Sequence, residues 1–114
     1  MSFEMFIPSR ISTDKEKITI LRAGTFWVNK KASEKFFKGF KRVLFYWDKE
    51  REVIGLKPVN NKENSYSLSR AKNRKDITIS GTAFLNHNGI SYKNTRNFEP
   101  SWNEKEKLVE IQLK

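Results

Sequence analysis

The sequence has no cysteine and only one histidine, His87, among its 114 residues. The lack of cysteine excludes disulfides, thiolate nucleophiles and cysteine metal sites. One histidine cannot build a histidine-based metal centre by itself, and no glycine-rich phosphate-binding loop is present. We therefore expect no cofactor, no metal site and no enzyme activity.

Long apolar runs are also missing. No stretch approaches the roughly 18 consecutive apolar residues that a membrane-spanning helix needs. Residues 1–10 alternate Phe3, Met5 and Ile7 with polar side chains, and they lack the apolar centre of a signal peptide. These two absences predict a cytoplasmic protein without a membrane partner.

Positive charge, by contrast, is in excess. The chain has 23 lysines and arginines against 13 aspartates and glutamates, which gives a net charge of +10. A small basic domain attracts polyanions before any specific contact forms, so nucleic acid is the expected partner. The alternative is a lysine-rich surface that only keeps the protein in solution. An aromatic content of 13% argues against general disorder.

Alternating apolar and polar residues predict a chain of short strands. The expected strands cover residues 18–20, 26–28, 42–47, 53–56, 66–68, 77–79 and 108–113, with Pro58 closing the fourth. Asn29 is expected to cap a helix over residues 30–38, and Ser80 to cap a shorter one over residues 81–86. Residues 91–97 are expected to form a loop. The expected core includes Val28, Phe45, Ile54, Ile79, Val109 and Ile111.

The expected elements occur twice in the same order. Residues 18–23 match 66–71, residues 26–32 match 77–83, and residues 47–54 match 102–109. We therefore predict a single domain over residues 1–114, with an N-terminal arm (1–16), repeat one (17–58), a linker (59–64) and repeat two (65–114). The predicted fold is a β-rich α+β structure, in which two strand–strand–helix–strand–strand repeats pack with pseudo-twofold symmetry. A plain α+β sheet with chance repetition is the alternative.

Each half resembles the swapped-hairpin barrel of AbrB-type transition-state regulators and MazE-type antitoxins. The spacing of residues 68–80 and 84–90 follows that family's strand, basic turn, strand and short helix, and residues 24–29 stand where the family has Gly-Arg-Ile-Thr-Ile-Pro. The family's proline is replaced by Asn29 and Ser80, and its basic residue by Thr25. The resemblance implies a swapped-hairpin-like barrel that binds DNA, here as a duplicated single chain. It also implies DNA contacts from Arg22 and Arg70 and from the basic turn that follows Arg70.

Charge is concentrated in repeat one, where residues 17–58 hold 11 basic and four acidic residues. Guanidinium and ammonium groups contact phosphates, and arginine can also read guanine edges in a major groove. The candidate nucleic-acid-binding residues lie in the first repeat, in its helix and in the basic turn of the second repeat: Arg22, Lys30, Lys31, Lys35, Arg70, Lys72, Arg74 and Lys75.

These observations predict a non-catalytic nucleic-acid-binding protein, with duplex DNA as the favoured partner and transcriptional regulation as its role. A second hypothesis is single-stranded DNA or RNA, with bases stacked on exposed aromatics, for which the candidates are Trp27, Phe45, Trp47, Tyr66, Tyr92 and Trp102. A third is a protein-interaction module, antitoxin-like or inhibitory, that contacts an acidic protein surface. The charged segment Asp48-Lys49-Glu50-Arg51-Glu52 is interpreted as a solvated hairpin turn rather than as a catalytic carboxylate pair.

Overall fold

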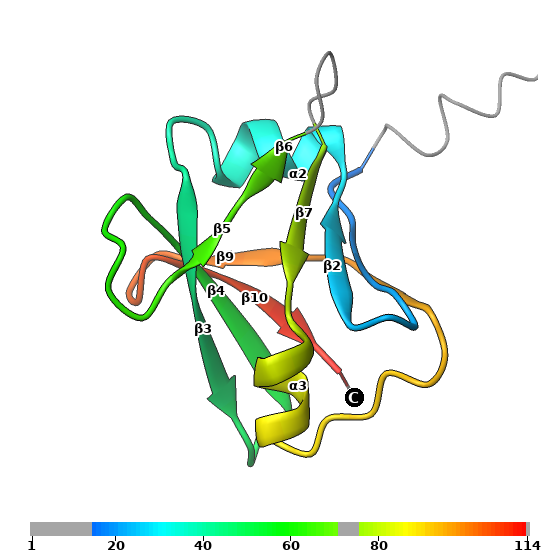
Figure 1. Ribbon diagram of the computed structural model, residues 1–114. Coiled ribbons are helices and arrows are strands. Elements are labelled where there is room, and N and C mark those ends of the chain that lie inside the picture. Colours follow the sequence, from blue (N-terminus) through cyan, green and yellow to red (C-terminus); the bar gives the residue numbers. More distant parts are fainter. Residues whose placement is uncertain (1–14, 71–75, 114) are drawn as a thin grey trace, which may run out of the picture.

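The computed structural model describes residues 15–70 and 76–113, which form two five-stranded antiparallel sheets and two helices (Figure 1). The first sheet has the order β6-β7-β2-β1-β8, with strands Ser69–Arg70, Ile77–Ser80, Thr25–Val28, Ile18–Ile20 and Arg96–Phe98. The second has the order β5-β3-β4-β10-β9, with strands Tyr66–Ser67, Arg42–Asp48, Val53–Val59, Leu108–Gln112 and Ser101–Asn103. The β-rich α+β class expected from the sequence is therefore confirmed.

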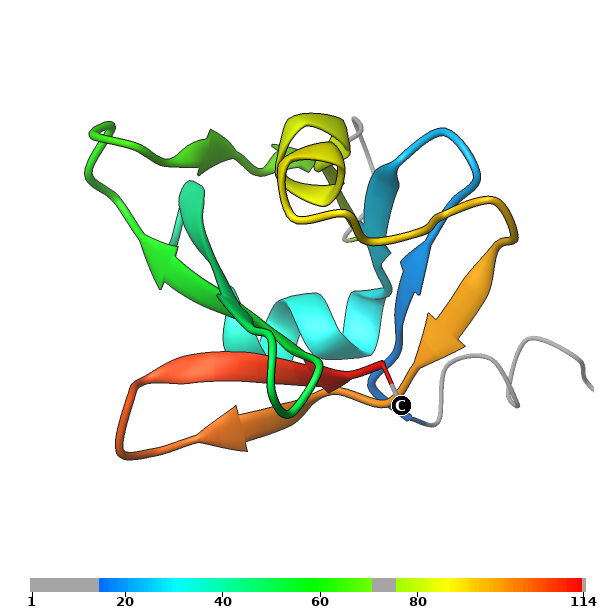
Figure 2. The same cartoon turned by 90° about the horizontal axis from the view of Figure 1, so that it is seen from below.

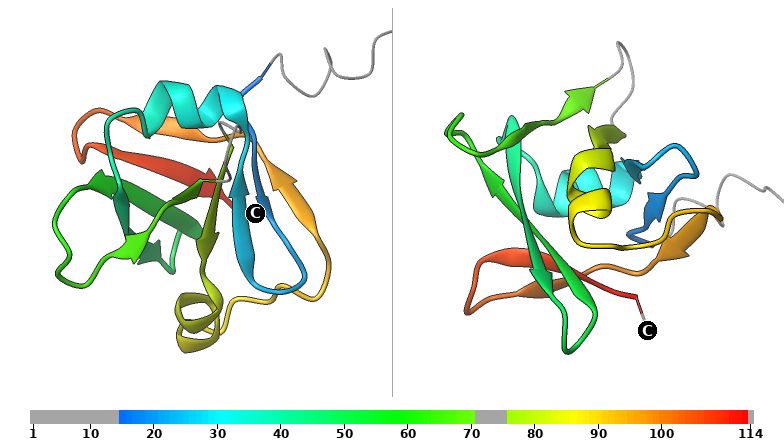
Figure 3. Two further views of the ribbon diagram at one scale, coloured as in Figure 1. Left: turned by 45° about the horizontal axis from the view of Figure 1, so that its top comes forward. Right: turned by 60° about the horizontal axis from the view of Figure 1, so that its bottom comes forward.

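The two helices lie at opposite ends of the space between the sheets. Helix α2 (Lys30–Phe36) follows β2, and helix α3 (Thr82–His87) follows β7. Figure 1 shows α2 at the top and α3 at the bottom, Figure 2 looks along this direction from the α3 end, and the left view of Figure 3 again shows the two helices at separate ends. The two ends of the molecule therefore differ in the helix that they present to solvent.

One apolar core joins the sheets and the helices. Strand residues that point inward are fully buried, and Ala32, Phe37 and Leu85 add to the same cluster. Of the six residues expected in the core, five are fully buried: Val28, Ile54, Ile79, Val109 and Ile111. Phe45 is only partly buried. It packs among the rings of Phe26, Tyr66 and Phe84, with centroid distances of 5.2, 4.8 and 4.6 Å.

Besides the longer connection from β2 to β3 through α2, two short stretches of chain pass from one sheet to the other. Strand β5 leads into β6 through Leu68, and β8 leads into β9 through Glu99 and Pro100. Figure 2 shows the second of these stretches crossing from the first sheet to the second. The described residues do not form the closed barrel expected from the sequence, because the strand ladders stop where the chain changes sheet. Pro100 has no N–H for such a ladder.

The second helix begins differently from the expectation. Ser80 is the last residue of β7, where it pairs with Thr25, and Gly81 is the N-cap of α3 without any side-chain capping bond. The Gly81 N–H donates to the Gly24 carbonyl at 3.0 Å. A methyl group at Gly81 would collide with the ring of Phe26, so this close approach requires glycine. The expected cap at Ser80 is therefore wrong.

Three further boundaries differ from those expected. Strand β4 continues through Pro58, which lies opposite Val43, rather than ending before it. Residues 96 and 97, expected in a loop, instead form β8 together with Phe98, beside β1, because Phe98 turns its side chain into the core. Helix α2 ends at Phe36, two residues before the expected Lys38, and Gly39 follows with a φ of 84°.

Candidate nucleic-acid interface

Helix α2 is fixed by its cap and by one apolar side. The Asn29 side chain accepts a hydrogen bond from the Ala32 N–H at 2.9 Å, which confirms the expected N-cap. The Asn29 amide also donates to the Lys15 carbonyl at 2.9 Å. Ala32, Ser33 and Phe36 are buried. The lysines of this segment consequently face solvent, and they are Lys30, Lys31, Lys35, Lys38 and Lys41.

Arg70 lies beside the end of this helix. Its guanidinium donates to the Phe37 carbonyl at 3.2 Å, next to the C-terminus of α2. A cation at this position is favoured by the negative end of the helix dipole. The structure thus brings together four of the predicted binding residues at one end of the molecule: Lys30, Lys31, Lys35 and Arg70.

The other predicted residues divide into two groups. Arg22 is exposed in the turn between β1 and β2, and β2 runs from that turn towards α2, so Arg22 lies at the opposite end of the strand (Figure 1). The structure therefore does not place Arg22 beside the α2 lysines. Lys72, Arg74 and Lys75 lie outside the described residues.

Two hollows run along the second half of α2 and share Lys38 and Phe40. The Arg70 hollow has a volume of about 640 Å³ and lies between α2 and β6. The Trp102 hollow has a volume of about 500 Å³, and its lining includes Lys35, Lys57 and Lys107. We call the two together the α2 groove. The sequence gives no sign that Lys57 and Lys107 meet α2, because they come from β4 and from the β9–β10 turn.

The groove carries a strong excess of positive charge. Residues 30–41 contain five lysines and one acidic residue, Glu34. Lys35 forms an ion pair with Glu16 at 3.4 Å. The pKa of the Glu16 carboxyl is lowered, first by a hydrogen bond from its own backbone and then by the charge of Lys35. Within the described part of the chain, Lys38 and Lys57 have no carboxylate partner. Their charges are therefore available to an anion.

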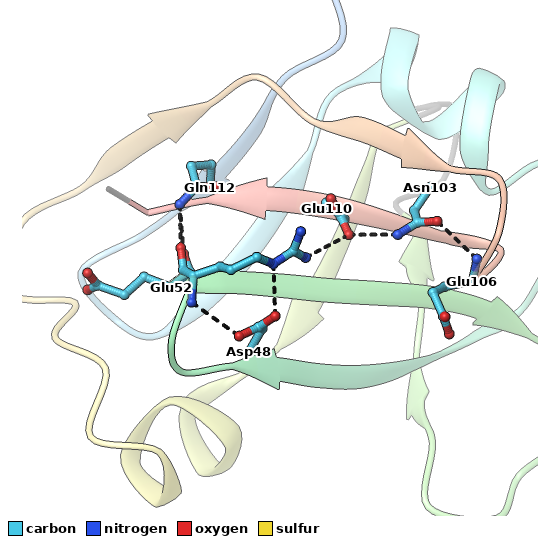
Figure 4. Close-up of polar contacts among 7 residues, drawn as sticks. Asp48, Glu52, Asn103, Glu106, Glu110 and Gln112 are labelled. Atoms are coloured by element: carbon cyan, nitrogen blue, oxygen red, sulfur yellow. Dashed lines mark hydrogen bonds and ion pairs between the residues drawn. The ribbon is translucent and has the colours of Figure 1, made fainter.

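The charged β3–β4 turn lies outside the groove, and its side chains are paired internally, as Figure 4 shows. Asp48 accepts hydrogen bonds from the Arg51 N–H at 3.1 Å and from its guanidinium at 2.8 Å. The guanidinium also contacts Glu110 at 3.2 Å, and Glu110 accepts from Asn103 at 2.9 Å. The backbone N–H of Arg51 is the main cause of the lowered pKa of Asp48. This network fits the interpretation of the segment as a solvated turn.

Metal-binding groups, membrane-spanning helices and the position of the single histidine show which other kinds of site the described residues could form. Among residues 15–70 and 76–113, no three His, Asp or Glu side chains are grouped so that they could hold a metal ion. Neither described helix has the length and apolar character to cross a membrane. His87 is exposed at the end of α3. Comparison with protein-family models, curated proteins and solved structures gave no match.

Proposed function

We propose that the protein is a non-catalytic nucleic-acid-binding protein whose α2 groove contacts the phosphate backbone. The observation that carries this proposal is the gathering of Lys30, Lys31, Lys35, Lys38, Lys41 and Arg70 at one end of the molecule. Phosphate oxygens are the usual partners of such groups, and the release of counterions supplies most of the affinity. Helix α3 at the other end has no lysine or arginine, so binding is expected at the α2 end alone.

We further propose that the two halves are copies related by a pseudo-twofold axis. Strand register supports this idea at two places. The matched blocks place Trp27 on Thr78, and these residues lie opposite each other where β2 pairs with β7. The same matching places Gly55 on Glu110, which are opposite each other where β4 pairs with β10. A residue that pairs with its own equivalent is what a twofold axis through the pair requires.

The two hairpin turns support the same relationship. Trp47 lies opposite Ile54, and Trp102 lies opposite Val109, in agreement with the matched blocks. Both turns contain a non-glycine residue with positive φ at the matched position, 54° at Glu52 and 57° at Lys107. Positive φ is uncommon outside glycine, so its repetition is informative. A relationship to AbrB-type and MazE-type proteins remains a prediction.

Salt dependence of binding tests the proposed function. Labelled duplex and single-stranded oligonucleotides would be titrated with the native protein and with Lys38→Ala/Lys41→Ala, which removes two lysines that line the groove, at several salt concentrations. Loss of two phosphate contacts should flatten the slope of log affinity against log salt by about 1.8 units on duplex or about 1.4 on a single strand. The native affinity should also fall steeply as salt rises.

A control variant that loses the same number of charges elsewhere distinguishes a defined binding site from general electrostatic attraction to nucleic acid. Lys49→Ala/Lys93→Ala removes the same two charges from the β3–β4 turn and from the loop after α3, outside both hollows, and should change the slope by much less. Equal effects of the two double variants would contradict an interface at α2. If the native protein bound no nucleic acid near ~100 mM salt, an acidic protein surface would become the favoured partner.

A further inference from the structure

The Trp102 hollow combines an exposed indole with several cations. Trp102 is 40% exposed, although tryptophan is usually well buried. One face of its ring stacks on Phe36 of α2, with the centroids 6.2 Å apart and the planes 14° from parallel. Lys35, Lys38, Lys57 and Lys107 line the same hollow. An aromatic platform among cations is the arrangement that binds unpaired bases together with their phosphates.

The indole is held in one orientation. Its N–H donates to the Glu104 carboxylate at 2.5 Å, and the same carboxylate forms an ion pair with Lys107. These hydrogen bonds lower the pKa of Glu104, with the bond from Lys107 as the main cause. Because Lys107 balances the charge of Glu104, the carboxylate fixes the ring without repelling an incoming phosphate strongly. A platform that is already oriented loses little entropy when a base stacks on it.

Because the two halves are proposed to be copies, the Trp102 hollow can be compared with the equivalent region of the other half. At the other end of the molecule, Trp47, Ile90 and Leu113 line a smaller hollow of about 210 Å³. Of these residues, Trp47 occupies the place of Trp102 in the matched blocks. Glu52 stands there in place of Lys107. The fold alone therefore does not generate a large basic hollow, because the hollow beside Trp47 is smaller and its lining balances Glu52 with Arg96.

We infer that the α2 groove binds single-stranded nucleic acid, with one base stacked on Trp102 and the adjoining phosphates beside Lys38 and Lys57. This inference rests on the proposed function and names its substrate. In a duplex the bases stack on one another and are not available to a protein ring, whereas an unpaired base is. Lys38 lines both hollows, so a strand that leaves Trp102 along α2 passes from one hollow into the other towards Arg70.

The test compares short labelled oligothymidylate, oligouridylate and a DNA duplex of equal length. The native protein should bind a single strand more tightly than the duplex. Trp102→Ala should weaken single-strand binding by about 5- to 150-fold, the range that follows from the loss of one stacked base. Tyr46→Ala removes an aromatic side chain of similar exposure, 46%, from outside the groove and should change affinity by less than about twofold. The two single strands distinguish DNA from RNA.

If Trp102→Ala fails to fold, the inference can still be tested with Trp102→Phe and tryptophan fluorescence. Phenylalanine still offers a ring, so Trp102→Phe should retain most of the affinity. Binding should quench native fluorescence through Trp102, and this quenching should be lost in Trp102→Phe. Lys57→Ala should flatten the single-strand salt slope by about 0.7.

The outcomes separate the two proposals. Unchanged affinity in Trp102→Ala, or quenching that persists in Trp102→Phe, would overturn base stacking on Trp102. The proposed function would still stand in that case if binding at α2 remained dependent on salt. Tighter binding of the duplex would likewise overturn only the single-strand inference. Failure of the native protein to bind any of the three probes would overturn both.

Discussion

Replacing Phe45 with alanine should destabilise the protein by about 2–4 kcal/mol. Core Phe→Ala substitutions cost about 3–5 kcal/mol, and the partial exposure of Phe45 places it below the top of that range. The ring contacts Phe26 from the first sheet, Tyr66 from the second and Phe84 from α3. Its removal therefore loosens the junction of both sheets with a helix, where each ring pair adds about 0.5–1.5 kcal/mol beyond buried area.

Urea unfolding followed by tryptophan fluorescence measures this loss. Phe45→Ala should lower the midpoint with little change in the slope of free energy against urea. Phe45→Leu keeps most of the volume but loses the three ring pairs, so it should cost less than Phe45→Ala without being neutral. Tyr46→Ala, the exposed neighbour, should change the free energy of unfolding by about 0.5 kcal/mol or less. A loss below about 1 kcal/mol in Phe45→Ala, or one equal to that of Tyr46→Ala, would refute the packing described here.

Three further predictions concern single positions. Gly81→Ala should cost about 1–3 kcal/mol of unfolding free energy, because the new methyl group meets the Phe26 ring; a neutral result would mean that α3 shifts freely. Asn29→Ala should cost about 1 kcal/mol through loss of the α2 cap, and Asn29→Asp should recover part of it; thermal unfolding of both variants measures the difference. The pKa of Asp48 is lowered from 3.8, so its contribution to stability is present above that pH and declines as the pH falls through the lowered value. Asp48→Asn should therefore lose less stability than the native protein in acid, and identical acid profiles would show that Arg51 does not hold the carboxylate.

Local sequence signals predicted most of the strands and one helix cap. The strands Ile18–Ile20 and Ile77–Ser80 are rich in β-branched residues, which favour strands. Asn29 precedes a lysine-rich segment that has apolar residues on one side, as a helix cap does. Such signals depend on neighbours in the chain and can be read without the fold. The strand at residues 96–98 was not predicted, because polar residues flank its single core residue, Phe98. It is a strand because β1 offers a partner, and only the tertiary fold supplies that partner.

The candidate site was predicted only in part. The lysines of α2 were identified because they are close together in sequence, and their helix brings them to one surface. Arg22 was included through the family resemblance, and the length of β2 separates it from α2. Lys57, Trp102 and Lys107 complete the groove from distant parts of the chain. Their meeting depends on the pairing of β4 with β10 and of β10 with β9, which charge and composition do not reveal.

The short stretches where the chain crosses from one sheet to the other also affect how readily the protein can self-associate. Each sheet ends in two short outer strands, and these are two residues long in β5 and β6 and three in β8 and β9. Long, straight outer strands offer unpaired backbone groups to which another chain can add a strand, the first step towards amyloid-like stacking. Here each outer strand bends into the other sheet before such a template can extend. The same bends that keep the described strands from closing into one barrel thereby protect a strand-rich, aromatic-rich chain against aggregation.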